Sequence, residues 1–265
     1  QDAATPVLDV TAASPGAWGN DLRITVDRAG ARNPDAQFNL VVSQLQADGV
    51  TLVVLETHRN LDMNSASSRY VESVVNNASM LVSAKRRGGL VFNQAGFAVS
   101  TAVTFPLTAT DLVIAGVVNG GTAFKLTLAV PAPGTMANLV TAVNTAIGAA
   151  GLTAALQASE SGADGSAGTG CLKLVSLASG ESSSVVISGG AFGGLSGSIQ
   201  LGLANGGREF TGDAQHRPAN VAAVVPPTKG VDGTRAGATE IVGSPAAKTG
   251  INALLDVDLF NILCI

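Results

Sequence analysis

Hydrophobic and polar positions alternate in the opening third of the chain, which predicts β-strands. The stretch 22–26 alternates Leu, Ile and Val with polar residues, and 38–42 does the same with Phe, Leu and Val. A period of two places the apolar side chains on one face of a sheet. A third strand is expected over 50–55, because Asp48-Gly49 before it is a strong hairpin-turn signal.

A short helix and a closing strand are expected next. Tyr70, Val71, Val74 and Val75 fall on one helical face. Ser67 and Ser68 stand where a side chain could cap the helix N-terminus. The strand that closes this part is predicted over 79–84.

The pattern changes between 88 and 210, where Gly, Ala, Ser and Thr dominate. Apolar residues recur at helical spacing over 136–147, with Pro133-Gly134-Thr135 as a start signal and Gly151 as a stop. This β-α-β-β order predicts a small inserted α+β domain. Its strands are expected at 124–130, 153–158, 171–177 and 183–188.

The last part, 211–265, begins as a loop that extends to about residue 240. A short helical stretch over 248–255 and a strand over 259–265 follow, which is how an α/β domain begins. The sequence starts at Gln1 and ends within an apolar run, so we interpret it as part of a longer polypeptide. Three parts are therefore expected: 1–87, which is β-rich, the insertion 88–210, and the return segment 211–265. The fold class is α+β and mainly β.

Composition narrows the functional classes. Hydrophobic residues make up 46% of the 265, and charged residues only 13%, about half the usual share. A surface so poor in charge favours burial in an assembly. The net charge of −4 and the 4% aromatic content argue against direct nucleic-acid binding. No apolar run is long enough for a membrane span.

Individual reactive residues do not form a recognisable site. Lys85-Arg86-Arg87 is predicted to be a solvated strand edge. The two cysteines, Cys171 and Cys264, are predicted to be buried and inert, and a disulfide between them is the alternative. His58 is expected to be exposed at a strand end, and His216 to lie in a loop. Neither histidine has the partners of a serine triad or a zinc site.

Carboxylate and glycine patterns are equally uninformative. Asp256 and Asp258 point the same way on an extended segment, but such a position is usually solvated. The pairs Gly189-Gly190 and Gly193-Gly194 lack the Lys-Ser/Thr that a phosphate-binding loop needs. We therefore predict no catalytic, cofactor-binding or metal-binding residues, and no enzyme activity.

Several ordered strings resemble contractile tail sheath proteins, the family of myophage sheaths and R-type tailocins. The strings are SPGAWGNDLRI at 14–24, FNL at 38–40, LE at 55–56, RNLDM at 59–63, SRYVESVVN at 68–76, GVDG at 230–233 and TGINAL at 249–254. They cover roughly 1–85 and 229–265. Between them, Val143-Asn144 within 136–147, GLTAA at 151–155 and LKLVS at 172–176 resemble the "IN" repeat of flagellar hook and filament proteins.

The sheath resemblance implies a β-sandwich-like domain, an outward-facing insertion and the entry into a subtilisin-like α/β domain. It implies a non-enzymatic subunit of the virion tail. Its partners would be copies of itself, the tail tube protein, the baseplate and the tail terminator. Trp18 is expected to fill the core of the sandwich, with Gly16 and Gly19 allowing sharp backbone turns beside it. An adhesion or interaction module related to flagellar proteins is the alternative.

Overall fold

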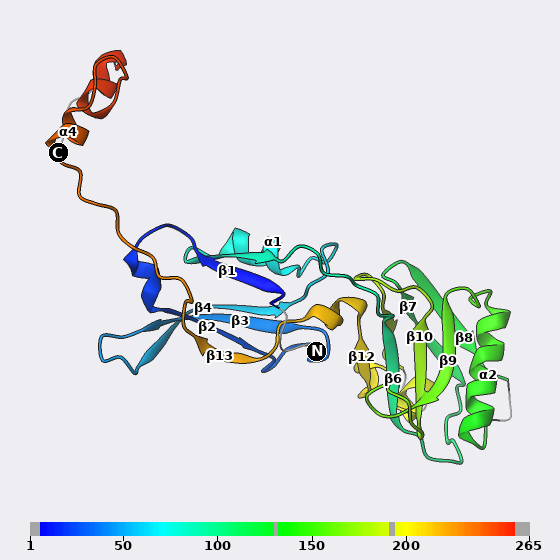
Figure 1. Ribbon diagram of the computed structural model, residues 1–265. Coiled ribbons are helices and arrows are strands. Elements are labelled where there is room, and N and C mark those ends of the chain that lie inside the picture. The colour runs from blue at the N-terminus through cyan, green and yellow to red at the C-terminus, as the bar shows by residue number, and fades with distance from the viewer. Residues whose placement is uncertain (1–5, 130–131, 191–193, 258–265) are drawn as a thin grey trace. The chain divides into compact units, whose positions relative to one another are not determined.

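The computed structural model describes residues 6–129, 132–190 and 194–257, and the chain divides into two compact units (Figure 1). The first unit comprises Gln1–Ser14 and Asp21–Pro226, and the second comprises Pro15–Asn20 and Pro227–Ile265. The structure is mainly β, with several antiparallel sheets and fewer helices, which confirms the predicted class at that level.

Within the first unit, two sheets and one helix form what we call the first lobe. A four-stranded sheet has the order β13-β2-β3-β4, and β1 pairs with β5 in a second sheet. Ile24 faces Val42 and Val26 faces Leu40 across the β2–β3 pair, as the alternation predicts. The elements are β1 (Leu8–Ala12), β2 (Leu22–Asp27), β3 (Phe38–Leu45), β4 (Leu52–Leu61), α1 (Val71–Ala78), β5 (Val82–Arg86) and β13 (Val221–Val224).

Helix α1 buries Val71 and Val75 in the core of this lobe. The predicted cap is wrong, because Tyr70 precedes the helix and no side chain caps it. The Ser67 hydroxyl instead accepts the Arg69 N–H, at 3.0 Å. The strand predicted from residue 79 begins later, since Ser79 ends the helix and its hydroxyl accepts the Val82 N–H.

The second lobe contains two further sheets, ordered β12-β6-β10-β9 and β11-β7-β8. Its apolar core includes residues of both sheets and of α2. Helix α2 packs against β8, β9 and β10. The elements are β6 (Phe97–Ala102), β7 (Val113–Val118), β8 (Thr122–Thr127), α2 (Met136–Ala149), β9 (Leu156–Ser161), β10 (Cys171–Ser176), β11 (Val185–Ile187), α3 (Leu195–Ser198) and β12 (Arg208–Phe210).

The predicted helix of this lobe is confirmed together with its two end signals. The Thr135 hydroxyl accepts the Asn138 N–H at the start of α2, and Gly151 has a left-handed backbone just after its end. Strands β6, β7 and β12 were not predicted. The loop expected over 211–240 is also wrong in part, because β13 pairs with β2 there.

Among the residues of the second unit that the structure describes, 15–20 and 227–257, the only regular elements are short helices. They are η1 (Ala17–Asp21), whose last residue belongs to the first unit, α4 (Ala238–Val242) and η4 (Gly250–Asp256). The helical stretch predicted over 248–255 is therefore a 3-10 helix at 250–256. The strand predicted over 259–265 and Cys264 lie outside the described residues.

Candidate interaction surface

The hairpin of β3 and β4 is closed by a tightly hydrogen-bonded turn. Gly49 adopts a left-handed backbone with φ of 72°. The Asp48 carboxylate accepts the backbone N–H groups of Val50 and Thr51, at 2.9 and 2.8 Å. The backbone donors of Val50 and Thr51 are thus satisfied within the turn itself.

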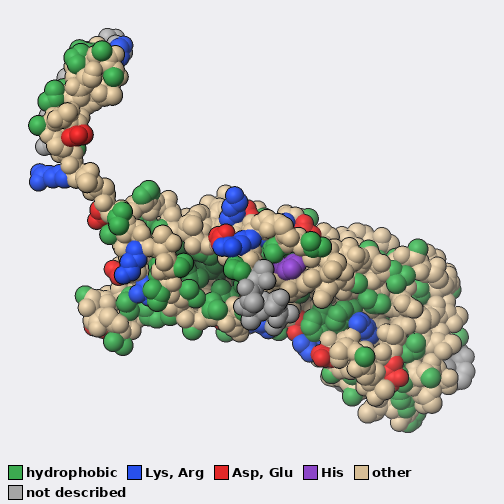
Figure 2. All heavy atoms as spheres, viewed as in Figure 1, with side chains coloured by type: hydrophobic (Ala, Val, Ile, Leu, Met, Phe, Trp, Pro, Cys, Tyr) green, Lys and Arg blue, Asp and Glu red, His purple; other side chains and the backbone are tan. Residues whose placement is uncertain are grey.

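The β4 side of this hairpin exposes apolar side chains on both faces. Leu52, Val53, Val54 and Leu55 are consecutive and all exposed, with Val54 at 59%. Val50 in the turn is 81% exposed. Figure 1 shows that this end of the hairpin extends past the other strands of its sheet, and Figure 2 shows hydrophobic side chains at the surface there. Contiguous exposed apolar residues of this kind mark interaction sites.

Side chains form hydrogen bonds to the outer edges of several strands in the first unit. An exposed edge presents unpaired N–H and C=O groups, which invite pairing with another chain. Asn144 on α2 bonds to both the N–H and the C=O of Ala158 in the edge strand β9, each at 2.9 Å. Asn76 on α1 does the same for Ala84 in β5, at 3.0 and 2.8 Å.

Two further edges are covered by single hydrogen bonds. The Asn33 side chain donates to the Glu209 carbonyl in β12, at 3.0 Å. The Glu209 carboxylate in turn accepts the Ile187 N–H in β11, at 2.8 Å. The sequence gives no local signal for these contacts, apart from the Val-Asn pair shared by 75–76 and 143–144.

The outer edge of β4 is covered along its second half only. Arg69 donates to the carbonyl of Asn60, at 3.2 Å, and to that of Arg59. Within the part of the chain that the structure describes, no side chain forms a hydrogen bond to the backbone of Leu52–Leu55. This stretch therefore combines exposed apolar side chains with an open strand edge.

In the second unit, two stretches that are 210 residues apart bind each other. The Asn20 side chain donates to the Gly230 carbonyl at 2.9 Å and accepts the Gly230 N–H at 2.8 Å. The Asp232 carboxylate accepts the Ala17 N–H at 2.7 Å. A Cβ at Gly230 would lie 2.0 Å from the Gly16 carbonyl oxygen, so only glycine fits there. Residues 16–20 and 230–232, which lie within the strings 14–24 and 230–233, are therefore held together by hydrogen bonds, and we call this contact the clasp.

Trp18 does not fill a sandwich core, contrary to the prediction. It lies in η1, and its side chain is 38% exposed. Its ring lies against Gly16, whose φ of 136° is one that other residues rarely adopt. The expectation of a sharp backbone turn at Gly16 is confirmed, but the tryptophan belongs to the clasp of the second unit.

The two histidines have structural contacts. His58 was expected to be exposed but is only 8% exposed, because β4 continues past it, and its ring nitrogen lies 3.2 Å from the Glu56 carboxylate. His216 contacts the Val91 carbonyl, at 2.9 Å, and packs edge-on against Phe92. Both rings are thus engaged in local packing.

Cys171 is buried as predicted, and burial raises the pKa of its thiol. The basic cluster Lys85-Arg86-Arg87 is only partly a solvated edge. Arg87 pairs with Asp9 at the surface, whereas Arg86 lies between the two lobes and pairs with Glu181. Asp258 and the side chain of Asp256 lie outside the described residues.

The described residues contain no group of three or more His, Cys, Asp or Glu side chains placed to hold a metal ion. None of the helices described is both long and apolar enough to cross a membrane. Compared with known proteins, the chain matches no protein-family model, no curated protein and no solved structure. Its function must therefore be argued from its own surfaces.

Proposed function

We propose that the chain is a structural, non-enzymatic subunit of a contractile tail sheath, which polymerises helically around a tail tube and contracts to drive the tube through a cell envelope. The observation that carries the proposal is the open, apolar edge at Leu52–Leu55. A helical array requires complementary patches that join head to tail, and an uncovered strand edge is suited to such a contact.

The clasp of the second unit supports the same proposal. The strings 14–24 and 230–233, which carry the resemblance to sheaths, are distant in sequence and hydrogen-bond to each other. In this proposal the first lobe belongs to a β-sandwich-like sheath domain, the second lobe is an insertion, and 230–257 leads into a subtilisin-like α/β domain. The partners are further copies, the tail tube protein, the baseplate and the tail terminator, in the virion tail.

Electron microscopy of the full-length protein tests assembly. We expect tubes with cogwheel-like ends for the unmodified protein. Val54→Lys should abolish the tubes, because a charge on the open edge cannot be buried without a partner. Val91→Lys is the control, since Val91 is also exposed, at 67%, but lies outside the hairpin. Monodisperse particles from the unmodified protein would overturn the proposal.

A second candidate is an adhesion or interaction module related to flagellar hook or filament proteins. It rests on the resemblance of 143–144, 151–155 and 172–176 to the "IN" repeat, and within that region Asn144 forms a double hydrogen bond that ties α2 to β9. Binding of the labelled full-length protein to bacterial cells, without tube formation, would favour this candidate. A peptidase is not proposed. Labelling of a specific serine by a serine-directed probe would contradict that view.

A further inference from the structure

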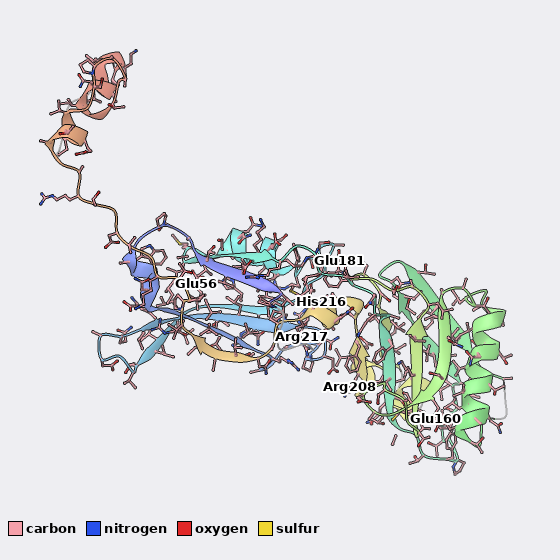
Figure 3. The ribbon with its side chains drawn as sticks, viewed as in Figure 1. Glu56, Glu160, Glu181, Arg208, His216 and Arg217 are labelled. Carbon is pink, nitrogen blue, oxygen red and sulfur yellow. The ribbon has the colours of Figure 1, made fainter. Side chains whose placement is uncertain are left out.

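The contact between the two lobes of the first unit is polar. Arg208 in β12 donates to the Asp35 carboxylate, with one distance of 2.9 Å, and Arg86 in β5 pairs with Glu181. The Ser65 hydroxyl also donates to Glu181, at 2.5 Å. Figure 3 labels Arg208 and Glu181 at this contact. A contact held by ion pairs and hydrogen bonds responds to protonation more readily than an apolar one.

Asp213 ties the segment that returns from the second lobe to the end of β4. It lies in the 3-10 helix η3 (Gly212–His216), and its side chain is only 2% exposed. One of its carboxylate oxygens, Oδ2, accepts the Met63 N–H at 3.0 Å. The two residues are 150 positions apart in the sequence. The presence of this hydrogen bond therefore reports whether η3, which we call the returning segment, is packed against the end of β4.

Asp62, the neighbour of Met63, faces the same polar cavity as Asp213. The cavity has a volume of about 180 Å³ and is also lined by Asn33, Gln37 and Thr211. The Ser67 hydroxyl donates to Oδ2 of Asp62, at 2.7 Å. The other oxygen, Oδ1, is enclosed, and no protein donor forms a well-aligned hydrogen bond to it among the described residues. An enclosed, negatively charged carboxylate with few donors is costly, and protonation removes the charge.

Burial raises the pKa of Asp62 to about 6, and the negative charge of Asp213 adds to the effect. The hydroxyl of Ser67, the N–H of Asn64 and the Arg69 charge act in the opposite direction without cancelling it. Burial also raises the pKa of Asp213. The other charged groups that face this cluster or the charges around it are Arg28, Asp35, Arg86, Glu181 and Arg217.

We propose that Asp62 and Asp213 form a proton-dependent latch, which holds the returning segment against the end of β4 when the pair carries a proton and loosens when it does not. The proton removes one of the two like charges that line the cavity beside the Met63 amide. The latch therefore tightens as the pH falls through about 6. This inference does not depend on the identity of the assembly.

Amide hydrogen exchange of the full chain at pH 5 and pH 7.5 tests the latch. The readout is the protection factor of the Met63 amide, corrected for the intrinsic pH dependence of exchange. In the unmodified protein we expect protection about tenfold higher at pH 5, within the roughly hundredfold that a shift of ~2 pKa units allows. Asp62→Asn should give high protection at both pH values, since the amide is neutral.

Asp111→Asn is the control, because Asp111 is an exposed carboxylate of the second lobe, outside the lining of the cavity. It should behave like the unmodified protein. Equal protection at both pH values in the unmodified protein, or an unchanged pH dependence in Asp62→Asn, would overturn the latch. Carbon-13 NMR of the Asp62 carboxyl provides a readout that needs no variant. A midpoint near 6 supports the proposal, and one below 5 overturns it.

Discussion

Asn144→Ala removes the two hydrogen bonds that join α2 to the edge strand β9. The side-chain amide of Asn144 satisfies both backbone groups of Ala158, which is buried at 3% exposure and pairs with Leu174 on its other side. After the substitution these backbone groups lose their partner beneath the helix. The change is therefore expected to destabilise the second lobe rather than the helix itself.

The size of the effect follows from the contacts. Each hydrogen bond contributes about 0.5–1.5 kcal/mol net, so the pair contributes roughly 2 kcal/mol. Alanine is the better helix former by about 0.6 kcal/mol, which offsets part of the loss. The control is Asn138→Ala on the same helix, where the asparagine is exposed and the same propensity gain applies. The two variants should thus differ in unfolding free energy by about 2 kcal/mol.

Differential scanning calorimetry measures this difference. For a chain of this size, 2 kcal/mol corresponds to a lowering of Tm by about 4–8 °C for Asn144→Ala relative to Asn138→Ala. Asn144→Asp is an informative third variant, because its carboxylate can accept the Ala158 N–H but repels the Ala158 carbonyl. Equal melting of the two alanine variants would refute the role assigned to Asn144.

Two further predictions concern the clasp and the latch. Gly230→Ala places a methyl group against the Gly16 carbonyl, so hydrogen exchange of the Ala17 amide should accelerate at least tenfold. The melting temperature of the first unit should not change. An Ala17 amide that stays protected would contradict this prediction. Asp62→Asn should stabilise the protein by about 1–2 kcal/mol at pH 8, after discounting the shift for solvent screening, and by only a few tenths of a kcal/mol at pH 4. The sign follows because a raised carboxyl pKa means that the ionised group destabilises the folded state, and chemical denaturation at the two pH values measures it.

Most elements with a clear period could be predicted from the sequence, although β1, whose Leu8 and Val10 alternate with polar residues, was missed. The alternation over 22–26 and 38–42 gives β2 and β3, and the pattern over 136–147 gives α2 with both of its end signals. The hairpin around the Asp48-Gly49 turn was predicted from the sequence in the same way. In each case the information lies in neighbouring residues, and the tertiary structure agrees with it.

The missed elements depend on partners that are distant in sequence. Strands β6 and β7 are short runs of apolar and small residues without alternation, so their period gives no signal. Strand β13 lies close to prolines and forms because β2, about 200 residues earlier, offers its edge. His58 was misplaced for a related reason. The predicted strand ended at 55, whereas β4 continues to Leu61 and turns that ring inward.

The candidate surface at Leu52–Leu55 could not be predicted from the sequence. It is recognised only because other strand edges are covered by side chains and this one is not. The stretch 50–55 has the composition of an ordinary buried strand, and a reader of the sequence would assign it to a core. The structure shows that Asn76, Asn144, Asn33 and Glu209 cover other strand edges with hydrogen bonds.

Such hydrogen bonds prevent an edge strand from pairing with another chain. Each of them costs conformational entropy, because the covering side chain is fixed in one conformation. Arg69 covers the second half of the β4 edge in the same way, which shows that this edge is within reach of a side chain. Yet Leu52–Leu55, next to it, exposes apolar side chains on both faces. Four other strand edges of this chain are covered by side chains, whereas the edge at Leu52–Leu55 is both open and apolar. Such an edge is best explained as a surface that another chain covers, and this is the contact that Val54→Lys should break.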